Sequence, residues 1–402
     1  MIEKGLVGFF KNFLEKDLLF RDKKVLQSNH IPESIPHRQD QIQQVAQILA
    51  PALKLQKPSN LFVYGKTGSG KTLSVQYVVD NINQLANEKN IPIKICYLNC
   101  KLKKVADTEY RLIAQIANEF GEVIPTTGLP TQEVYKIFFN VIDKNNQLII
   151  LVLDEIDQLV EKTGDEVLYN LTRINSELKK AQISLIGISN NLIFTDNLDP
   201  RVKSSLSEEE ILFPAYNAIQ LQDILRERAG KAFKKDAIGS GVIEKCAAYA
   251  AREHGDARRA LELLRVAAEI AERKGLTKTT IKHIDEAEDK IDSDCVLDLV
   301  KTQPKQIQAT LYSIIHIFGK RKSKILTGEV YNFYKSICSK IKLRPLTQRR
   351  ISDIISELDM LGIINGKVIS KGRYGRTREI SLAIQPTMEP RIKDILEQSL
   401  GI

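Results

Sequence analysis

The sequence predicts an α/β domain with a parallel sheet, then an all-helical domain, then a unit of three helices and a β-hairpin. Four apolar runs lack polar alternation, which is typical of strands covered by helices on both faces. After Pro214 only helical apolar spacing remains, and a basic hairpin with two glycines follows residue 362. With 402 residues and 43% hydrophobic content, the chain is too long for one ordinary core, so two or three domains are expected.

The α/β part is predicted to extend from about residue 35 to 215. Helical patterns separate its apolar runs, and the first of these helices is predicted over Leu73 to Asn83. Neighbouring parallel strands need crossover connections, which are usually helices, so strands that alternate with helices predict a parallel sheet. The predicted strands are Leu61 to Tyr64, Ile93 to Leu98, Leu148 to Leu153 and Ile183 to Ile188.

A glycine-rich loop, GKTGSGKT, joins the first strand to the first helix and matches G-x-x-x-x-G-K-[ST]. Its glycines allow backbone N–H groups to turn toward phosphate oxygens, and the helix N-terminus adds positive charge. We expect Lys71 to reach the β- and γ-phosphates and Thr72 to bind Mg²⁺. The alternative is a purely structural glycine turn. The predicted phosphate-binding residues are Gly65, Lys66, Thr67, Gly68, Ser69, Gly70, Lys71 and Thr72.

Polar residues follow the third and fourth predicted strands. Asp154 and Glu155 end the third, so we expect Asp154 to hold the metal and Glu155 to act as the general base that activates water. A pair of solvated acids is the alternative. Asn190 follows the fourth strand, where it could contact the γ-phosphate or the attacking water, although Asn is equally a turn residue.

The all-helical domain is predicted from apolar spacing and from glycines at expected C-terminal stops. Gly255 and Gly275 are those stops. The predicted helices are Ala218 to Ala229, Val242 to Glu253, Ala257 to Arg273 and Ile281 to Ile291.

The last unit has the plan of a winged helix-turn-helix. Its third helix is predicted to begin after Thr347, a plausible N-cap, and to stop at Gly362. The other predicted elements are helices over Gln306 to Phe318 and Gly328 to Ile341, and strands over Ile363 to Ile369 and Glu379 to Ile384.

The basic character of the chain belongs to this unit. Residues 301 to 402 hold 19 Lys and Arg against 8 Asp and Glu, while the whole chain has a net charge of +9. We expect the third helix to enter the major groove of DNA end-on and the hairpin to contact its backbone or minor groove. A charged, solvated hairpin is the alternative. The predicted DNA-binding residues are Thr347, Gln348, Arg349, Arg350, Lys371, Arg373, Tyr374, Arg376 and Arg378.

The cysteines and the first 20 residues indicate where the protein works and which kinds of site it lacks. Five cysteines without CxxC pairing favour reduced thiols in a cytosol and no metal site. The first 20 residues are interrupted by charges, which excludes a signal peptide or a membrane span and favours an amphipathic helix or a loosely held arm.

Ordered motifs along residues 20 to 390 closely resemble the AAA+ initiators of the archaeal origin-recognition type, which are related to origin-recognition subunits and to the cell-division-cycle helicase loader. Besides the loop, the motifs are IPHR at 35–38, which is similar to the family's adenine-side motif, and LVLDEID, GISNN, LDPRVKSSL, FPAYNAIQLQDILRER, HGDARRALELLR and LTQRRISDIISELDMLGII. The resemblance implies an AAA+ P-loop NTPase with a helical lid and a winged helix. The implied domains are an arm over 1–34, an AAA+ domain over 35–215, a lid over 216–298 and a DNA-binding domain over 299–402.

The resemblance also implies roles for single residues. Asn190 matches the first sensor, and Asn191 departs from the family's usual acid. Arg201 matches the arginine finger, which acts on a neighbouring subunit's nucleotide, and Arg258 matches the second sensor. By residue type alone, either arginine could instead be a solvated surface residue. The remaining implied nucleotide contacts are Arg38, Tyr216 and Arg228.

The implied function is that of an ATP-controlled replication initiator that binds origin duplex DNA and helps to load the replicative helicase. Its cofactors would be ATP or ADP with Mg²⁺, its hydrolysis would be slow, and it would be a monomer that assembles on DNA with other initiator subunits. The segment 101–146 is similar to the family's extra helical insertion, which also contacts DNA. The alternatives are an ATP-responsive transcription regulator and a clamp loader or branch-migration motor.

Overall fold

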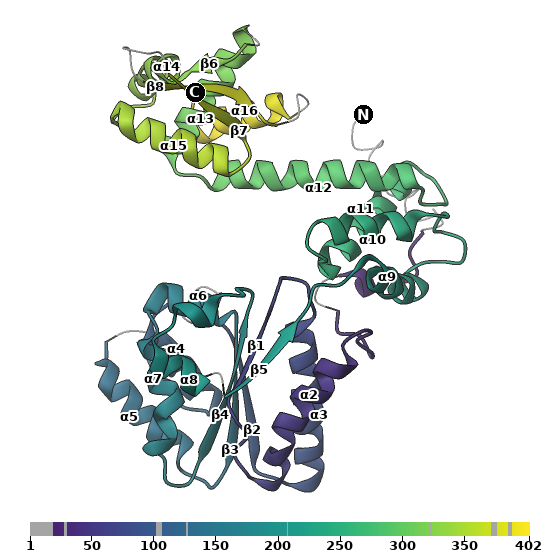
Figure 1. Ribbon diagram of the computed structural model, residues 1–402, viewed down its shortest axis with the longest axis vertical. Helices are drawn as coiled ribbons and strands as arrows, with labels where there is room; N and C mark the ends of the chain where they lie inside the picture. Colours follow the sequence, from purple (N-terminus) through teal and green to yellow (C-terminus); the bar gives the residue numbers. More distant parts are fainter. Residues whose placement is uncertain are drawn as a thin grey trace, which may run out of the picture. The chain divides into compact units, whose positions relative to one another are not determined.

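A computed structural model describes residues 19–27, 30–101, 107–125, 128–206, 208–321, 323–370, 376–384 and 388–402 (Figure 1). The side chains of Cys295, Ser370 and Arg376 lie outside this description. By its internal contacts the chain divides into two units, residues 1–284 and 285–402. Within the described ranges, no helix combines the length and the apolar character that crossing a membrane requires.

The first unit contains a parallel sheet of five strands in the order β2-β3-β4-β1-β5. Four of them confirm the predicted strands. The fifth was missed because only two of its side chains, Ile211 and Phe213, are buried at the sheet edge. The strands are β1 (Leu61–Gly65), β2 (Ile93–Asn99), β3 (Leu148–Asp154), β4 (Gln182–Ser189) and β5 (Glu209–Phe213).

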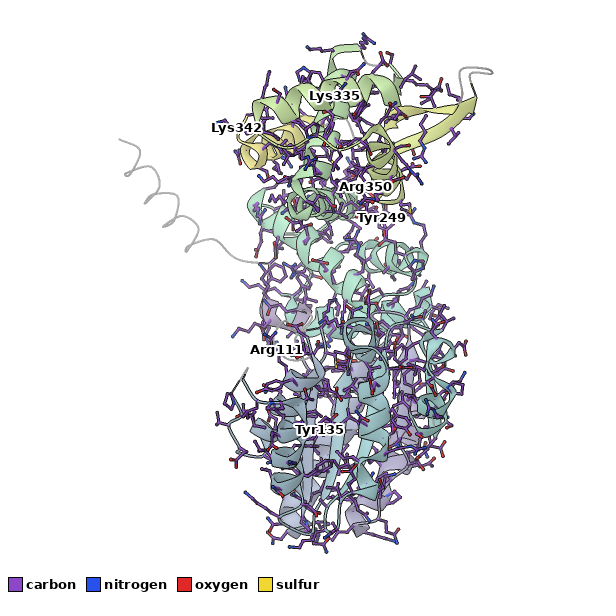
Figure 2. All side chains as sticks on the ribbon, turned by 90° about the vertical axis from the view of Figure 1, so that its left-hand side faces the viewer. Arg111, Tyr135, Tyr249, Lys335, Lys342 and Arg350 are labelled. Atoms are coloured by element: carbon purple, nitrogen blue, oxygen red, sulfur yellow. The ribbon has the colours of Figure 1, made fainter. Side chains whose placement is uncertain are left out.

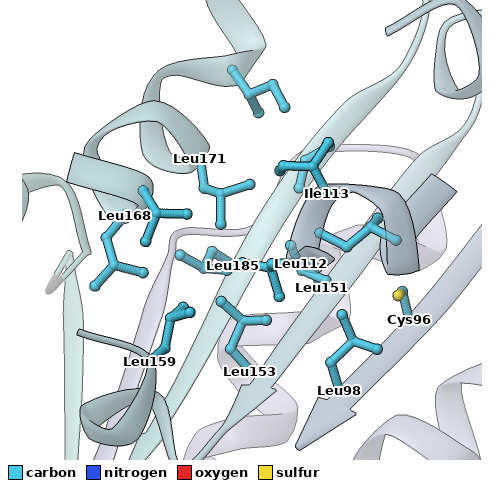
Figure 3. Packing of buried hydrophobic residues seen from close by; sticks show 14 of the residues in the cluster. Cys96, Leu98, Leu112, Ile113, Leu151, Leu153, Leu159, Leu168, Leu171 and Leu185 are labelled. Carbon is cyan, nitrogen blue, oxygen red and sulfur yellow. The ribbon is translucent and has the colours of Figure 1, made fainter. Parts of the chain in front are cut away.

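Helices cover both faces of this sheet, as the unbroken apolar strands require (Figure 1). On one face, Leu112, Leu159 and Leu168 pack against strand residues such as Leu151 and Leu153 (Figure 3). The other face is covered by α2 and α3. The helices are α2 (Gln39–Leu49), α3 (Lys71–Lys89), α4 (Glu109–Glu119), α5 (Thr131–Ile142), α6 (Ile156–Thr163), α7 (Glu166–Arg173) and α8 (Pro200–Leu206).

The long connection from β2 to β3 contains α4 and α5, which pack on the sheet with Leu112, Ile116 and Phe138. The predicted insertion therefore has a buried apolar face and is not a pair of freely solvated helices. Its Lys103 and Lys104 lie outside the described residues.

The helical lid completes the first unit. Its helices α9 (Ala218–Ala232), α10 (Val242–Arg252) and α11 (Ala257–Arg273) confirm the predicted pattern. Residues 19–27 pack on this lid, since Phe20 stacks on Phe233 with ring centroids 4.8 Å apart and Leu19 is buried. These residues are therefore firmly held, whereas residues 1–18 lie outside the described ranges.

The second unit is a winged helix with its own apolar core. Thr347 caps α15 by accepting a hydrogen bond from the Arg350 N–H, as predicted, and Gly362 follows the helix with φ +70°. The short β6 and the last helix were missed. The elements are α13 (Lys305–Arg321), β6 (Ile325–Leu326), α14 (Thr327–Lys340), α15 (Gln348–Met360), β7 (Ile364–Ser370), β8 (Arg376–Leu382) and α16 (Glu389–Leu400).

Several helices are longer than predicted, α3 and α12 most of all. The first connecting helix, α3, begins at Lys71 itself, and α12 extends from Ile281 to Thr302 although the sequence predicted an end at Ile291. Near the end of α12, Val300 is buried in the core of the second unit and Leu299 packs against that core. The predicted domain boundaries stay predictions.

Candidate nucleotide site

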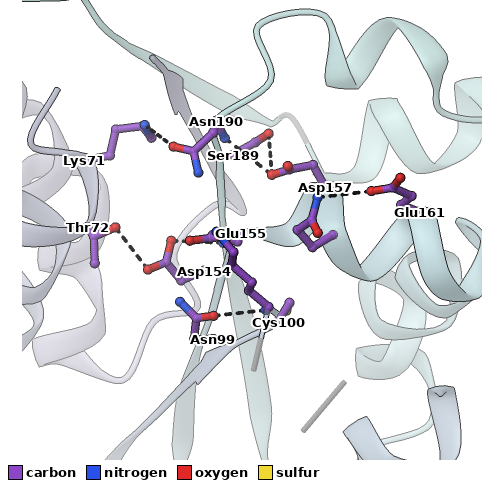
Figure 4. Close-up of polar contacts among 12 residues, drawn as sticks. Lys71, Thr72, Asn99, Cys100, Asp154, Glu155, Asp157, Glu161, Ser189 and Asn190 are labelled. Atoms are coloured by element: carbon purple, nitrogen blue, oxygen red, sulfur yellow. Dashed lines mark hydrogen bonds and ion pairs between the residues drawn. The ribbon is translucent and has the colours of Figure 1, made fainter. Parts of the chain in front are cut away.

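The parallel sheet brings the predicted motifs together. The carboxyl ends of β1, β3 and β4 lie at one edge, and they carry the glycine loop, Asp154 and Asn190 (Figure 4). A cavity of about 380 Å³ opens there. Among its lining residues are ten that the sequence had singled out: Gly68, Gly70, Lys71, Thr72, Asp154, Glu155, Asn190, Tyr216, Arg228 and Arg258.

Close packing fixes the glycine loop against the lid. Gly68 has φ +71°, and an added Cβ would overlap the carboxylate of Asp256 and approach its Cα to 2.9 Å. Gly70 has φ +89°, and its Cβ would lie 2.8 Å from the Tyr216 hydroxyl oxygen. The Ala257 N–H also donates to the Gly68 carbonyl at 3.3 Å. A side chain at either glycine would therefore push the loop away from the lid.

Lys71 is buried beneath this loop. Its Nζ donates to the Gly65 carbonyl at 2.8 Å, to the Lys66 carbonyl at 2.9 Å and to Asn190 Oδ1 at 2.9 Å (Figure 4). All three amine protons are thus engaged by neutral acceptors. Burial lowers the pKa of Lys71 to about 8, although the nearby Asp154 opposes the shift. A buried cation that lacks a close anion is suited to a phosphate group.

The low pKa of Lys71 gives a prediction about proton uptake. Phosphates beside the amine favour its charged form and raise its pKa, so nucleotide binding at pH 8 should take up about half a proton per site. Nucleotide affinity should correspondingly fall as the pH rises above 8. Calorimetry of ADP binding in buffers with different ionisation enthalpies measures this number. Lys71→Arg is the control, since arginine stays charged and should take up none. Equal values for both proteins would contradict the assignment.

The acidic side of the site has an oxygen donor set. The Thr72 hydroxyl donates to Asp154 Oδ2 at 3.0 Å, and the Glu155 N–H donates to Asp154 Oδ1 at 3.0 Å (Figure 4). Hydroxyl and carboxylate oxygens suit Mg²⁺, which usually keeps one or two protein ligands and takes others from phosphates and water. The described residues contain no group of three or more His, Cys, Asp and Glu that could enclose a metal. The residues present therefore fit a magnesium–nucleotide complex.

Glu155 adopts a strained backbone conformation between β3 and α6. Its φ of 54° and ψ of 47° are left-handed, which costs about 1–3 kcal/mol for a residue that is not glycine. The side chain is 18% exposed and lies 3.6 Å from Lys101 Nζ. Strain of this kind is often found in active sites, and here it accompanies a carboxylate that lines the cavity.

Two polar supports of the site were missed. Asp157 Oδ1 accepts hydrogen bonds from the Ser189 hydroxyl at 2.9 Å and from the Asn190 N–H at 3.4 Å, so it holds the residue that contacts Lys71. The Tyr97 hydroxyl donates to Asp154 Oδ2 at 2.5 Å. Asp157 stands within the LVLDEID motif, whereas Tyr97 would have required knowing which strand neighbours β3.

Arg38 is not among the residues that line the cavity, and its predicted contact with nucleotide stays a prediction. It is 1% exposed, and its guanidinium donates to the carbonyls of Ser69 at 2.8 Å, Pro214 at 2.5 Å and His37 at 2.8 Å. It also stacks 3.7 Å from the ring centre of Tyr216. Arg38 therefore supports the glycine loop from behind and ties it to the segment that enters the lid.

The residues that precede Arg38 supply an apolar wall to the cavity. Ile31, Pro32, Ile35 and Pro36 line the cavity, together with Ile224 and Leu261 of the lid. Apolar walls with a few polar groups are typical of nucleotide-sized pockets. The cavity is thus lined both by these apolar side chains and by the glycine loop with Lys71.

The lid arginines occupy different positions. Arg258 lies in the first turn of α11, where Asp256 caps the helix by accepting from the Arg258 N–H at 2.8 Å. Arg228 is 8% exposed and donates to the Val25 carbonyl at 3.2 Å. Both line the cavity, so the helix N-terminus and two cations face it.

Arg201 lies outside the cavity, on α8. Its side chain is 67% exposed, and its Nε and Nη2 contact the two carboxylate oxygens of Asp199 at 3.1 and 3.0 Å. The guanidinium also lies 5.2 Å from the ring centre of Tyr169. Any role of Arg201 in nucleotide chemistry therefore concerns a site other than this chain's own cavity.

In the second unit, the first turn of α15 is exposed. It contains Gln348, Arg349 and Arg350, and Arg350 lies 3.8 Å from Asp353 and 3.6 Å from Glu357 of the same helix (Figure 2). The guanidinium of Arg378 donates to the Ser352 carbonyl at 3.3 Å and to the Ser356 hydroxyl, so it joins the wing to α15. The predicted contacts Lys371, Arg373 and Tyr374, and the side chain of Arg376, lie outside the described residues.

Family models match consecutive parts of the chain, in the same order as the sheet domain, the lid and the winged helix. Residues 54–192 match an AAA domain, residues 222–289 a Cdc6 AAA+ ATPase-type lid domain, and residues 298–388 the C-terminal winged helix domain of CDC6. The fold and the site thus define an AAA+ ATPase-type protein with a Cdc6-type lid and a winged helix.

Similar proteins cover nearly the whole chain. The ORC1-type DNA replication protein of Pyrococcus horikoshii is 53% identical over 381 residues, which are 94% of this chain and 90% of that one. ORC1-type DNA replication protein 1 of Methanosarcina mazei is 49% identical over 95% of this chain and 92% of its own. Aeropyrum pernix ORC1, solved in complex with DNA, is 42% identical with a TM-score of 0.83, over 95% of this chain and 98% of that one. The chain belongs to the family of ORC1-type DNA replication proteins.

Proposed function

We propose that this protein is an ATP-binding initiator of DNA replication that recognises origin duplex DNA and helps to load the replicative helicase. The observation that supports the proposal is that one chain contains both a cavity lined by the glycine loop, Asp154 and Arg258 and a winged helix of the same family. Among the similar proteins, one was solved in complex with DNA. We also propose that the protein works in the cytosol and that it is a monomer which assembles with other initiator subunits on DNA.

In this proposal the cavity binds ATP or ADP with Mg²⁺. The glycine loop and Lys71 hold the phosphates, Thr72 and Asp154 hold the metal, and the apolar wall at Ile35 receives the base. The metal would supply charge neutralisation at the phosphates. Glu155 acts as the general base and Asn190 orients the water. Arg258 contacts the γ-phosphate from the lid.

The proposal gives ATP the role of a switch with slow turnover. The γ-phosphate would hold the lid through Arg258 and engage Arg201 of a second subunit, and hydrolysis would release both. The exposed position of Arg201, outside its own cavity, supports action on a neighbour.

The general-base role has a direct test. Glu155→Gln should bind ATP with wild-type affinity, because it keeps the shape of the side chain. Its rate of ATP hydrolysis should be at least about 100-fold lower than that of the wild type. Single-turnover hydrolysis with a radiolabelled nucleotide measures the rate. Glu161→Gln, on the helix α6 that follows Glu155, is the control and should keep the wild-type rate. Unchanged hydrolysis in Glu155→Gln would remove the assignment.

The DNA-binding proposal rests on the exposed first turn of α15 and on the basic wing. Each neutralised phosphate contributes about 0.9 to the slope of log K against log salt. Replacing Arg373 and Arg376 by Ala should weaken binding to all duplexes and reduce this slope by about 1.8. Fluorescence anisotropy at several salt concentrations measures it, with the Ala double variant of Arg391 and Lys393 on α16 as the control. A slope that stays the same would exclude the wing from the interface.

The experiment that tests the function as a whole is a map of binding sites across the genome. Chromatin immunoprecipitation should place the protein inside replication origins. The alternative, a transcription regulator, predicts enrichment at promoters instead. The similarity to replication proteins over almost the entire chain supports the initiator.

A further inference from the structure

The carboxylate of Asp154 receives hydrogen bonds on both of its oxygens. Oδ1 accepts from the Glu155 N–H at 3.0 Å, while Oδ2 accepts from the Thr72 hydroxyl at 3.0 Å and from the Tyr97 hydroxyl at 2.5 Å. Asp154 is 4% exposed, so water contributes little to its orientation. Its position therefore depends on these three donors.

The sheet fixes the position of Tyr97. It lies on β2, which pairs with β3 in parallel so that Tyr97 is opposite Val152 and Asn99 is opposite Asp154. Its ring packs against the apolar cluster under α2 and α3. Tyr97 is not among the residues that line the cavity, so it reaches the site only through Asp154.

We infer that Tyr97 is a positioning residue that orients Asp154 toward a magnesium–nucleotide complex, an inference that rests on the proposed function. The hydroxyl of Thr72 is shared between Asp154 and the metal that Thr72 is proposed to bind. Tyr97 is the side-chain donor to Asp154 Oδ2 that has no such second task. It keeps the carboxylate aligned whether the metal is present or absent.

Two effects of the tyrosine hydroxyl oppose each other. A donor on Oδ2 withdraws electron density and weakens the attraction of the carboxylate for a cation. It also prevents the carboxylate from turning away from Thr72. Loss of comparable partners of metal ligands generally reduces metal affinity by about 10- to 100-fold, so orientation is the larger effect.

The chain offers a matched control. The Tyr135 hydroxyl on α5 donates to the carboxylate of Glu109 at 2.7 Å, in the same unit but outside the cavity (Figure 2). Tyr97→Phe and Tyr135→Phe each remove one phenol–carboxylate hydrogen bond and keep the ring. They separate a general loss of packing or stability from an effect at the site.

The test measures binding of a fluorescent ADP analogue to the full-length protein in EDTA and across a Mg²⁺ titration. Tyr97→Phe should bind the analogue like wild type in EDTA but should require about tenfold more Mg²⁺ to reach its tight-binding form. Tyr135→Phe should match wild type in both conditions. Melting temperatures of all proteins check that the variants are folded.

Two outcomes would overturn the inference: an unchanged Mg²⁺ requirement, or an equal loss of binding with and without Mg²⁺. A double-variant cycle tests the route through the carboxylate, since Tyr97→Phe should have no further effect on the Mg²⁺ requirement in an Asp154→Asn protein. Failure of the wild-type protein to bind the analogue at all would refute the proposed function and is thus distinguishable from a failure of the inference.

Discussion

Replacing Gly68 by Ala should reduce nucleotide affinity by roughly 100-fold, which corresponds to losing one or two charge-assisted hydrogen bonds of about 1.5–3 kcal/mol each. The added Cβ would overlap the Asp256 carboxylate, which caps α11, and would come within 2.9 Å of the Asp256 Cα. The glycine loop and the lid would have to separate. Arg258 and the loop could then no longer contact the same phosphates. Titration of a fluorescent ADP analogue measures the affinity.

Gly121→Ala is the matched control for this substitution. Gly121 also has a positive φ, of +89°, but nothing lies within 4 Å of its added Cβ. Both variants therefore suffer the backbone strain, of about 1–2 kcal/mol, and only Gly68→Ala suffers the overlap. Nucleotide binding that is equally strong, or equally weak, in both variants would mean that contact between loop and lid does not govern affinity.

Replacing Arg38 by Met should destabilise the first unit by about 3 kcal/mol or more. The substitution removes the donor to the carbonyls of Ser69 and Pro214, and each buried acceptor left without a partner costs about 1–3 kcal/mol. It also removes the stacking on Tyr216. The melting temperature should fall by roughly 5–10 °C. Since Arg38 also supports the loop, nucleotide should rescue the variant only in part.

The control is Arg273→Met on α11, whose side chain is 65% exposed and should contribute about 0.5 kcal/mol or less. Differential scanning fluorimetry with and without ADP compares the two variants. If Arg38→Met had the same melting temperature as the wild type, the three carbonyls would have found other donors. That result would show that Arg38 does not link the glycine loop to the lid.

Much of this site could be predicted from the sequence because its residues belong to contiguous motifs at the ends of parallel strands. The glycine loop, Asp154, Glu155 and Asn190 meet at one edge of the sheet for that reason alone. Thr347 was likewise a correct N-cap because capping is a local interaction.

The remaining features depend on contacts between distant parts of the chain. The buried contacts of Arg38 could not be predicted because its acceptors include Pro214, 176 positions away. Tyr97 was missed because its partner lies 57 positions along the chain, on the neighbouring strand. The edge strand β5 was missed because Glu209 and Glu210 leave it little apolar character. Arg378 was predicted as a DNA contact, and only the structure shows that it joins the wing to α15.

The most direct test of the central claim is the affinity of the full-length protein for an origin duplex in three states: without nucleotide, with ADP and with a non-hydrolysable ATP analogue. If the nucleotide controls DNA binding, duplex affinity should differ by at least about fivefold between the ATP-analogue and ADP states. Because such coupling is reciprocal, bound duplex should change the ratio of the affinities for the analogue and for ADP by the same factor. Identical duplex affinity in all three states would contradict it.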